Sequence, residues 1–291
     1  MKRLLTMLVV GGVACSMTAC LNDDAHFVDF TNTPAIVDVP SSAFYGAVEN
    51  RGFPIQTTPN SYTFNVNLSG PNTLSEDVTV TMAVDPALLT QYNANNGTDY
   101  QLLPAALYQA SGLTATIKAG QRLAGPITVN LYTDATRVPD PATYNDAGYA
   151  LPLRITAVSN SNVAVSSNYG YKILVSKIKN QYDGTYQATG TFTHPVATSS
   201  RAINKEKTLV TVNTTTIETE FADLGASDWR MQLTVNADNT VTLKPVGASN
   251  TSTTQFGVNK YDPATRTYTL NYKYPGSGGD RVINETLKFE Q

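Results

Sequence analysis

Side chains that could perform acid–base or metal chemistry are scarce in this 291-residue sequence. It contains two histidines, His26 and His194, and two cysteines, Cys15 and Cys20. Nucleophilic triads and most metal sites need histidine or cysteine. His26 lies near the N-terminus and His194 closes an alternating segment, so we interpret both as structural or solvent-facing. The sequence also lacks a phosphate-binding glycine loop and a His-Glu-x-x-His motif. It therefore predicts no cofactor and no metal.

A group of carboxylates in the second half of the chain could suggest hydrolysis of glycosidic bonds: Glu218, Glu220, Asp223 and Asp228. Glycosidases place two carboxylates across a cleft. Glu218 and Glu220, however, alternate with threonines and share one face of a predicted strand. This pattern is typical of a solvated sheet edge, so we expect no catalytic residues and no enzyme.

Aromatic side chains offer binding chemistry instead. Sugars are held by aromatic faces that stack on their C–H surfaces, while amides and carboxylates bond the hydroxyls. Trp229 is the single tryptophan; it follows a loop of small residues and is flanked by Asp228 and Arg230. Trp229 is therefore our candidate ligand-binding residue. The alternative, which the sequence leaves open, is that its ring packs into a core.

The N-terminus has the pattern of a secretory signal. Lys2 and Arg3 precede a short apolar run over residues 4–13, and small residues then lead to Cys20. The run is too short for a spanning helix, which needs about 20 apolar residues. We therefore assign residues 1–19 to a cleaved signal peptide and residues 20–39 to a tether.

Residues 16–20, Ser-Met-Thr-Ala-Cys, resemble a bacterial lipobox. The resemblance implies cleavage before Cys20 and a diacylglycerol group on its sulfur. The alternative is an ordinary signal peptide cut after Ala19. We favour lipidation because the mature chain would otherwise carry one free thiol in an oxidising compartment. Two or three acyl chains, at roughly 0.8 kcal/mol per buried methylene, would hold the protein to a membrane.

Two carboxylates, Asp23 and Asp24, follow the lipobox directly. They resemble the acidic export signal of Bacteroidetes surface lipoproteins, which implies a location on the outer face of the outer membrane. The alternative is a solvated acidic linker. Charged residues make up 15% of the chain, net charge is -3, and no basic block occurs, so we expect no nucleic-acid partner.

The first half of the mature chain is rich in strand signals. Apolar and polar residues alternate strictly over residues 62–68 and 78–84, and again in later segments up to residue 175. Asp85-Pro86 predicts a short helix, because aspartate caps and proline suits the first turn. Pro152 favours an edge strand or an irregular strand start. We predict an immunoglobulin-like β-sandwich over residues 40–178.

Several motifs of this half occur in a specific order: Asp-Pro-Ala-Leu-Leu-Thr-Gln-Tyr from residue 85, Leu-Leu-Pro from 102, Ile-Lys-Ala-Gly from 117 and Tyr-Ala-Leu-Pro-Leu-Arg-Ile from 149. The series resembles the uncharacterised N-terminal β-sandwich domain of Bacteroidetes surface lipoproteins, which also precedes catalytic domains in some family-18 glycosidases. The resemblance covers roughly residues 26–178. It implies polysaccharide utilisation at the cell surface, with other outer-membrane utilisation proteins as partners.

Residues 182–291 predict a second, smaller unit. Short alternating strands follow one another with turns at 236–239 and 262–266, which fits an antiparallel barrel or meander. Small Ala188 and Gly190 permit close approach of a neighbouring strand or a bend. Tyr272 and Tyr274 share a strand face with Tyr268, and we favour a core position for them. The unit resembles the small C-terminal domain that accompanies the first family.

The sequence thus predicts an all-β, non-catalytic surface lipoprotein that binds carbohydrate. The alternative class is a structural or adhesive surface protein with protein partners. An exposed apolar patch or a free edge strand would favour the alternative, and an aromatic platform would favour glycan binding.

We expect Cys20→Ser to release the protein from membranes, because no other segment is apolar enough to anchor it. Fractionation of cells tests this, and a mutant that stays in the membrane pellet would contradict it.

Asp23→Ala combined with Asp24→Ala should keep the anchor but lose display on the cell exterior. Protease shaving of intact cells is the measurement, and unchanged cleavage would remove the export-signal interpretation.

Overall fold

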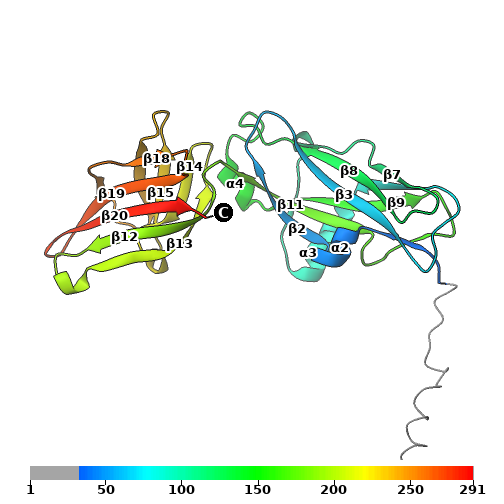
Figure 1. Cartoon of the computed structure of the whole chain (residues 1–291), viewed down its shortest axis with the longest axis horizontal. Helices are drawn as coiled ribbons and strands as arrows, with labels where there is room; N and C mark the ends of the chain where they lie inside the picture. The colour runs from blue at the N-terminus through cyan, green and yellow to red at the C-terminus, as the bar shows by residue number, and fades with distance from the viewer. Residues whose placement is uncertain (1–32, 291) are drawn as a thin grey trace, which may run out of the picture.

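The computed structural model describes residues 33–290, which form two β-rich lobes placed end to end along the long axis (Figure 1). The first lobe is a sandwich of two sheets and the second is built from one continuous sheet. Each lobe has its own hydrophobic core. The predicted all-β class, with an immunoglobulin-like sandwich before a smaller antiparallel domain, is confirmed.

The sandwich consists of two sheets with mostly antiparallel neighbours. The first sheet has the order β10-β1-β3-β8-β6. Its strands are β1 (Ile36–Asp38), β3 (Asn60–Ser69), β6 (Tyr108–Gln109), β8 (Leu123–Leu131) and β10 (Ala164–Val165). The second sheet has the order β2-β11-β9-β4-β7, with β5 also paired to β9. Its strands are β2 (Val48–Pro54), β4 (Val78–Val84), β5 (Gln101–Leu102), β7 (Thr114–Ile117), β9 (Tyr149–Val158) and β11 (Tyr171–Lys179).

Alternation along the strands sets which side chains form the core between the sheets. On β3, Tyr62, Phe64, Val66 and Leu68 are buried, while the residues between them face outward. The fully buried Val78 and Val80 of β4 belong to the same core cluster. Burying such side chains contributes about 1.5–3 kcal/mol each, so the two-residue period in the sequence fixes the inner face of each sheet.

Three short helices connect the strands: α2 (Pro40–Tyr45), α3 (Pro86–Asn96) and α4 (Pro141–Asp146). The predicted helix after Asp85 is confirmed, since its carboxylate accepts the N–H groups of Ala87 and Leu88. Asp140 and Pro141 repeat the same start signal in α4, where Asp140 accepts Thr143 N–H at 3.1 Å. The Asp-Pro pair is therefore the sequence signal for this helix as well.

Pro152 lies near the start of β9, a central strand, so of the two predicted positions the edge is wrong and the irregular strand start is the one observed. On one side β9 pairs with β11, and Pro152 lies opposite Ile173. On the other side the pairing with β4 begins at Leu153, and the short pairing with β5 ends at Ala150. Pro152 therefore lies in the gap between two partners, where its missing N–H removes no ladder hydrogen bond.

The C-terminal domain is a meander whose first and last strands also pair. The sheet order is β16-β15-β14-β13-β12-β20-β19-β17, with β18 paired to β19. Its strands are β12 (Gly184–Thr193), β13 (Arg201–Thr211), β14 (Thr216–Glu220), β15 (Trp229–Val235), β16 (Val241–Gly247), β17 (Thr254–Gln255), β18 (Lys260–Asp262), β19 (Thr267–Gly276) and β20 (Gly279–Phe289). An isolated bridge between Thr240 and Lys260 brings the two ends of the sheet together, so the domain approaches a closed barrel.

Tyrosines fill the centre of this second core. Tyr186, Tyr268 and Tyr272 are fully buried and Tyr274 is nearly so, which confirms the predicted core position of the β19 tyrosines. Gly190 lies against β20, where an added Cβ would come within 2.1 Å of the Asn284 carbonyl oxygen. The predicted close approach at this glycine is confirmed.

A polar joint connects the two domains between β11 and β12. The Asn180 side chain accepts Tyr182 N–H at 2.9 Å and donates to the carbonyls of Asn213 and Thr216 at 2.7 and 3.0 Å. On the sandwich side, the Asn145 amide of α4 exchanges two hydrogen bonds with the backbone of Ile178. These hydrogen-bonded amides, Asn180 buried and Asn145 partly buried, fix the direction in which the chain leaves one domain and enters the next.

We expect the fragments 179–291 and 182–291 both to unfold cooperatively, because the second core is contained within them. The longer fragment should be more stable by about 1–3 kcal/mol, since it retains the Asn180 hydrogen bonds at about 0.5–1.5 kcal/mol each. Thermal melts of the two fragments test this. Absence of a cooperative melt for both would show that the C-terminal domain does not fold alone.

Candidate functional site

A groove of about 860 Å³ opens on the edge of the sandwich, beside α2. A second hollow, near α4, has about 310 Å³. The wall of the larger groove comes from α2, β2 and β3: Pro40, Ser41, Phe44, Tyr45, Val48, Glu49, Asn50, Tyr62, Thr63, Phe64 and Asn65. It therefore has the size of a ligand pocket and touches both sheets.

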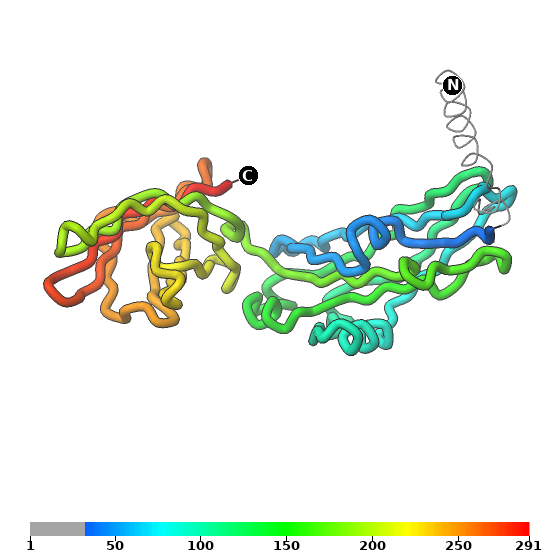
Figure 2. Tube along the Cα trace, turned by 90° about the horizontal axis from the view of Figure 1, so that it is seen from below, coloured from blue at the N-terminus to red at the C-terminus, as the bar shows by residue number. Residues whose placement is uncertain are grey.

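The groove exists because the chain changes sheets. β1 pairs with β3 only from Asn67 to Ser69, and the chain then forms α2 and joins the other sheet as β2, parallel to β11. In Figure 2 this blue segment runs along the seam between the two layers. Residues 60–66 of β3 are consequently paired on one side, with β8, among the described strands.

Local sequence explains the crossing. Pro40 occupies the first turn of α2, where its missing N–H costs nothing, and Ser42 Oγ donates to the Tyr171 carbonyl at 2.8 Å. Gly46 then ends the helix at φ 92°, a conformation that favours glycine. These contacts fasten α2 over the edge of the second sheet.

Two neighbouring aromatic side chains of α2 are exposed at the groove. Phe44 and Tyr45 retain 81% and 77% of their accessible surface. Their ring centroids are 4.7 Å apart and the ring planes meet at 77°. The pair presents apolar ring surface next to the polar side chains of Asn50, Thr63 and Asn65. Exposed aromatic surface of this kind is typical of a binding surface rather than of a core.

The floor of the groove holds a charged cluster. Glu49 Oε2 accepts the Tyr62 hydroxyl at 2.9 Å and lies 2.9 Å from the Nζ atom of Lys172, whose side chain is fully buried. Arg51 approaches the other carboxylate oxygen at 3.5 Å and lies over the Tyr62 ring. Burial would raise the pKa of the Glu49 carboxyl, but the adjacent Lys172 ammonium, the hydrogen bond from Tyr62 and the charge of Arg51 lower it overall.

Two buried polar atoms at this place have no well-directed hydrogen bond. Ser41 Oγ has no partner among the described residues, and Lys172 Nζ has its ion-pair partner Glu49 but no hydrogen bond of good geometry. Such groups are rare in folded proteins and usually mark a position taken by water or a ligand. The donors and acceptors that a hydroxyl-rich ligand can reach are the Glu49 carboxylate and the side chains of Asn50, Thr63 and Asn65.

Trp229, the residue predicted from the sequence, lies at the start of β15 in the other domain. It is half-buried, and its ring packs against Tyr274 at 4.9 Å and Phe221 at 5.6 Å. Much of its surface therefore belongs to the packing of the C-terminal core. Trp229 and the α2 groove come from different domains, so the structure does not bring them into one site.

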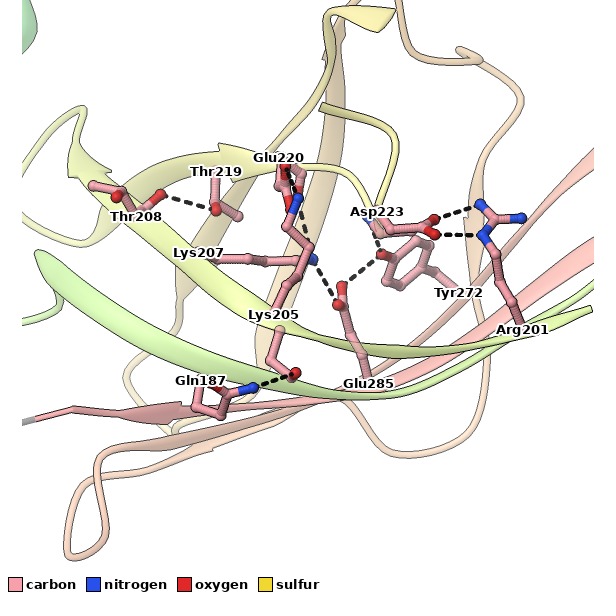
Figure 3. Close-up of polar contacts among 12 residues, drawn as sticks. Gln187, Arg201, Lys205, Lys207, Thr208, Thr219, Glu220, Asp223, Tyr272 and Glu285 are labelled. Atoms are coloured by element: carbon pink, nitrogen blue, oxygen red, sulfur yellow. Dashed lines mark hydrogen bonds and ion pairs between the residues drawn. The ribbon is translucent and has the colours of Figure 1, made fainter. Parts of the chain in front are cut away.

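Three of the four carboxylates considered in the sequence, Glu218, Glu220 and Asp223, are each paired with a cation. Glu218 accepts from Arg230 at 2.5 Å, Glu220 accepts from Lys205 at 3.0 Å, and Asp223 accepts two hydrogen bonds from Arg201. Figure 3 shows the Asp223 and Glu220 pairs on the wall of the C-terminal domain. β14, which carries Glu218 and Glu220, lies between β13 and β15, so the predicted sheet edge is wrong. The cation pairs favour a charged sheet surface over an acid–base couple.

A second buried cluster lies inside the C-terminal domain (Figure 3). Lys207 Nζ and Glu285 Oε2 are 2.6 Å apart, and both side chains are fully buried. Tyr272 donates to the other Glu285 oxygen at 2.6 Å and accepts Ala222 N–H at 2.9 Å. Burial and the Glu285 charge raise the pKa of Tyr272 well above its usual range. With every side chain enclosed, this cluster supports the fold rather than contact with a substrate.

The predictions for Cys20, Asp23 and Asp24 lie outside the described residues. None of the helices in residues 33–290 has the length and apolar content needed to cross a bilayer. Within the same residues, no group of three or more histidine, cysteine or acidic side chains is arranged to hold a metal ion.

Sequence reasoning missed the α2 groove. Phe44 and Tyr45 stand in a stretch rich in small residues, without the alternation that marks the inner face of a strand. Two adjacent aromatics after Pro40 on a short helix were the available signal, because a six-residue helix cannot bury both neighbouring side chains on one face.

The fold defines a class: a two-domain, all-β protein in which an immunoglobulin-like sandwich precedes a smaller meander domain. A family model described as an N-terminal domain matches residues 37–162, and one described as C-terminal matches residues 170–290. Together they cover more than half of the chain. The chain therefore belongs to this two-domain family, as the sequence resemblance predicted.

Solved structures from Bacteroides ovatus share the fold. One protein of unknown function has a TM-score of 0.56 at 14% identity, covering 90% of this chain and 93% of that chain. A multidomain protein including DUF1735 has a TM-score of 0.53 at 15% identity, covering 88% and 94%. Identities this low establish the fold alone. The comparison with curated proteins found no match.

We expect Glu49→Gln to lower the free energy of unfolding by roughly 3–5 kcal/mol at pH 7, because it leaves the buried Lys172 charge unpaired. The folded-state pKa of Glu49 is lowered, so its contribution is present above the unfolded value near pH 4.3 and is lost as pH falls through the folded value. The difference in the free energy of unfolding between the variant and the wild type should therefore become smaller below about pH 4.

Lys172→Met is the matched control for this measurement. It removes the buried charge and leaves Glu49, whose side chain is 29% exposed, with Tyr62, Arg51 and water. Its loss of stability in urea denaturation should be clearly smaller than that of Glu49→Gln. Equal losses would mean that the unpaired lysine charge is not the cause.

Proposed function

We propose that this protein is a non-catalytic carbohydrate-binding protein and that the α2 groove holds the glycan. The observation that carries the proposal is the exposed Phe44–Tyr45 pair, which stands beside hydroxyl and amide groups at an open edge of the sandwich. Aromatic faces bind the C–H surface of a sugar ring, and amides, hydroxyls and a carboxylate bond its hydroxyl groups.

The same groove is poorly equipped for glycoside hydrolysis. Glu49 is the single carboxylate among the lining residues, and it is already engaged by Lys172 and Tyr62. Hydrolysis requires a second carboxyl group across the bound sugar. Binding without turnover is therefore the function that the lining residues support best.

Location completes the proposal. Lipid on Cys20 would anchor the mature chain, and Asp23 and Asp24 would direct it to the exterior of the outer membrane. There the two domains would present the groove to polysaccharides outside the cell, beside other utilisation proteins. Such an anchor would keep captured polymers at the cell surface.

A second candidate function is adhesion to a protein partner, favoured by one observation. Residues 60–66 of β3 and the outer side of β2 are strand edges without a partner strand among the described residues. An extended peptide could add to such an edge through backbone hydrogen bonds. The exposed aromatic rings favour the sugar, because strand addition does not require them.

We expect a soluble form starting at Asp23 to bind glycans on an array, and Phe44→Ala with Tyr45→Ala to weaken that binding by tenfold or more, about 1.4 kcal/mol. The free energy of unfolding should change by less than about 0.5 kcal/mol per residue, because both side chains are exposed. Titration calorimetry and thermal melts measure the two effects.

Trp229→Ala serves as the comparison from the other domain. It should cost roughly 3 kcal/mol of stability, because its ring packs on Phe221 and Tyr274. It should leave glycan affinity unchanged. If Trp229→Ala abolishes binding while the α2 double variant binds normally, the glycan site lies in the C-terminal domain and the groove assignment is wrong.

A further inference from the structure

We infer that the α2 groove takes neutral glycans and that Glu49 and Arg51 select them by bonding neighbouring hydroxyl groups. The inference rests on the proposed function, since it names the class of ligand for the same groove. We expect the groove not to bind polymers that contain uronic acids or sulfate groups.

The wall of the groove carries little charge. Glu49 is the single charged side chain among the lining residues; the polar ones are otherwise Ser41, Asn50, Thr63, Asn65 and the tyrosine hydroxyls. These uncharged groups exchange hydrogen bonds with hydroxyls without favouring an anion. An acidic sugar would lose its hydration here and would gain no direct ion pair with a lining residue.

The two cations near the groove already have partners. Lys172 is fully buried behind Glu49, so a ligand in the groove cannot reach its ammonium group. Arg51, two residues along β2 from Glu49, is half-exposed; its guanidinium lies over the Tyr62 ring and 3.5 Å from Glu49. The charges that a ligand can reach, Glu49 and Arg51, therefore cancel.

Glu49 and Arg51 together can bond two neighbouring hydroxyl groups. A carboxylate accepts hydrogen bonds from two neighbouring hydroxyls, and a guanidinium donates to their oxygens. Glu49 uses one oxygen for Tyr62 and Lys172, which leaves Oε1 with only the distant Arg51 contact among the described residues. Vicinal hydroxyls of an uncharged sugar can donate to this oxygen and accept from Arg51, whereas a ligand carboxylate would face the Glu49 charge.

Binding of two sets of soluble polymers to the full mature chain tests the inference. The neutral set contains mannan, xyloglucan, galactan and chitin oligomers; the acidic set contains polygalacturonate and chondroitin sulfate. We expect binding to at least one neutral polymer, a change of less than threefold between 50 and 500 mM NaCl, and no binding to the acidic set. Ionic binding would weaken far more over this range of salt.

Arg51→Gln provides the variant and Arg122→Gln the control. Arg51→Gln keeps some donors but loses the charge, and it should weaken neutral binding three- to tenfold while leaving the melt unchanged. Arg122 donates to backbone carbonyls of Leu68 and Gly70, away from the groove, so its variant should bind normally.

The outcomes separate the two levels of the proposal. Tighter binding of an acidic polymer, lost in high salt and in Arg51→Gln, would overturn the neutral class while keeping glycan binding. Failure of every polymer to bind would overturn the proposed function itself. Neutral binding that Arg51→Gln leaves unaltered would overturn the role of the Glu49–Arg51 pair.

Discussion

The change of sheet between β1 and β2 is the constraint on which the rest of the N-terminal domain depends. One chain segment closes part of the edge of both sheets, so neither edge is covered along its full length. Pro40 ends the pairing with β3, and the parallel ladder from Val48 to Pro54 begins the pairing with β11. The helix between them spans the seam and carries its aromatic side chains outward. The groove follows directly from the backbone's need for hydrogen-bond partners.

Each domain also contains one buried lysine that is paired with a glutamate and supported by a tyrosine hydroxyl. In the sandwich the set is Lys172, Glu49 and Tyr62, and in the meander it is Lys207, Glu285 and Tyr272. Buried charges of this kind contribute little net stability, because desolvation offsets the attraction, but they penalise any arrangement that separates the partners. The difference is access: Glu49 faces a groove, whereas Glu285 is enclosed. The same chemistry can therefore meet a ligand in the first domain and only hold strands together in the second.

The joint gives the groove a defined position relative to the C-terminal domain. Asn145 and Asn180 satisfy backbone groups on either side of the β11–β12 connection, so the polar linker is held by specific hydrogen bonds. This arrangement reconciles two separate cores with one elongated molecule (Figure 1). It also explains why the aromatic cluster around Trp229 remains distinct from the groove, since the domains meet end to end and do not share a binding wall.

The sequence by itself determined the strands and their inner faces, because alternation on a period of two depends only on neighbouring residues. The ordered motifs between residues 85 and 155 carried the resemblance to the family. Tyr62 to Leu68, the Asp85 cap and the β19 tyrosines were all predictable in this way. Pro152 was not, since the cost of its missing N–H depends on where β4 and β5 stop. Phe44, Tyr45 and Glu49 were not recognisable as a site either. Glu49 obtains its partner from Lys172, which is distant in sequence. Phe44 and Tyr45 are exposed at an edge that exists only when the two sheets are stacked. Local pattern specifies which face of a strand is buried, whereas only tertiary packing decides which edge stays open.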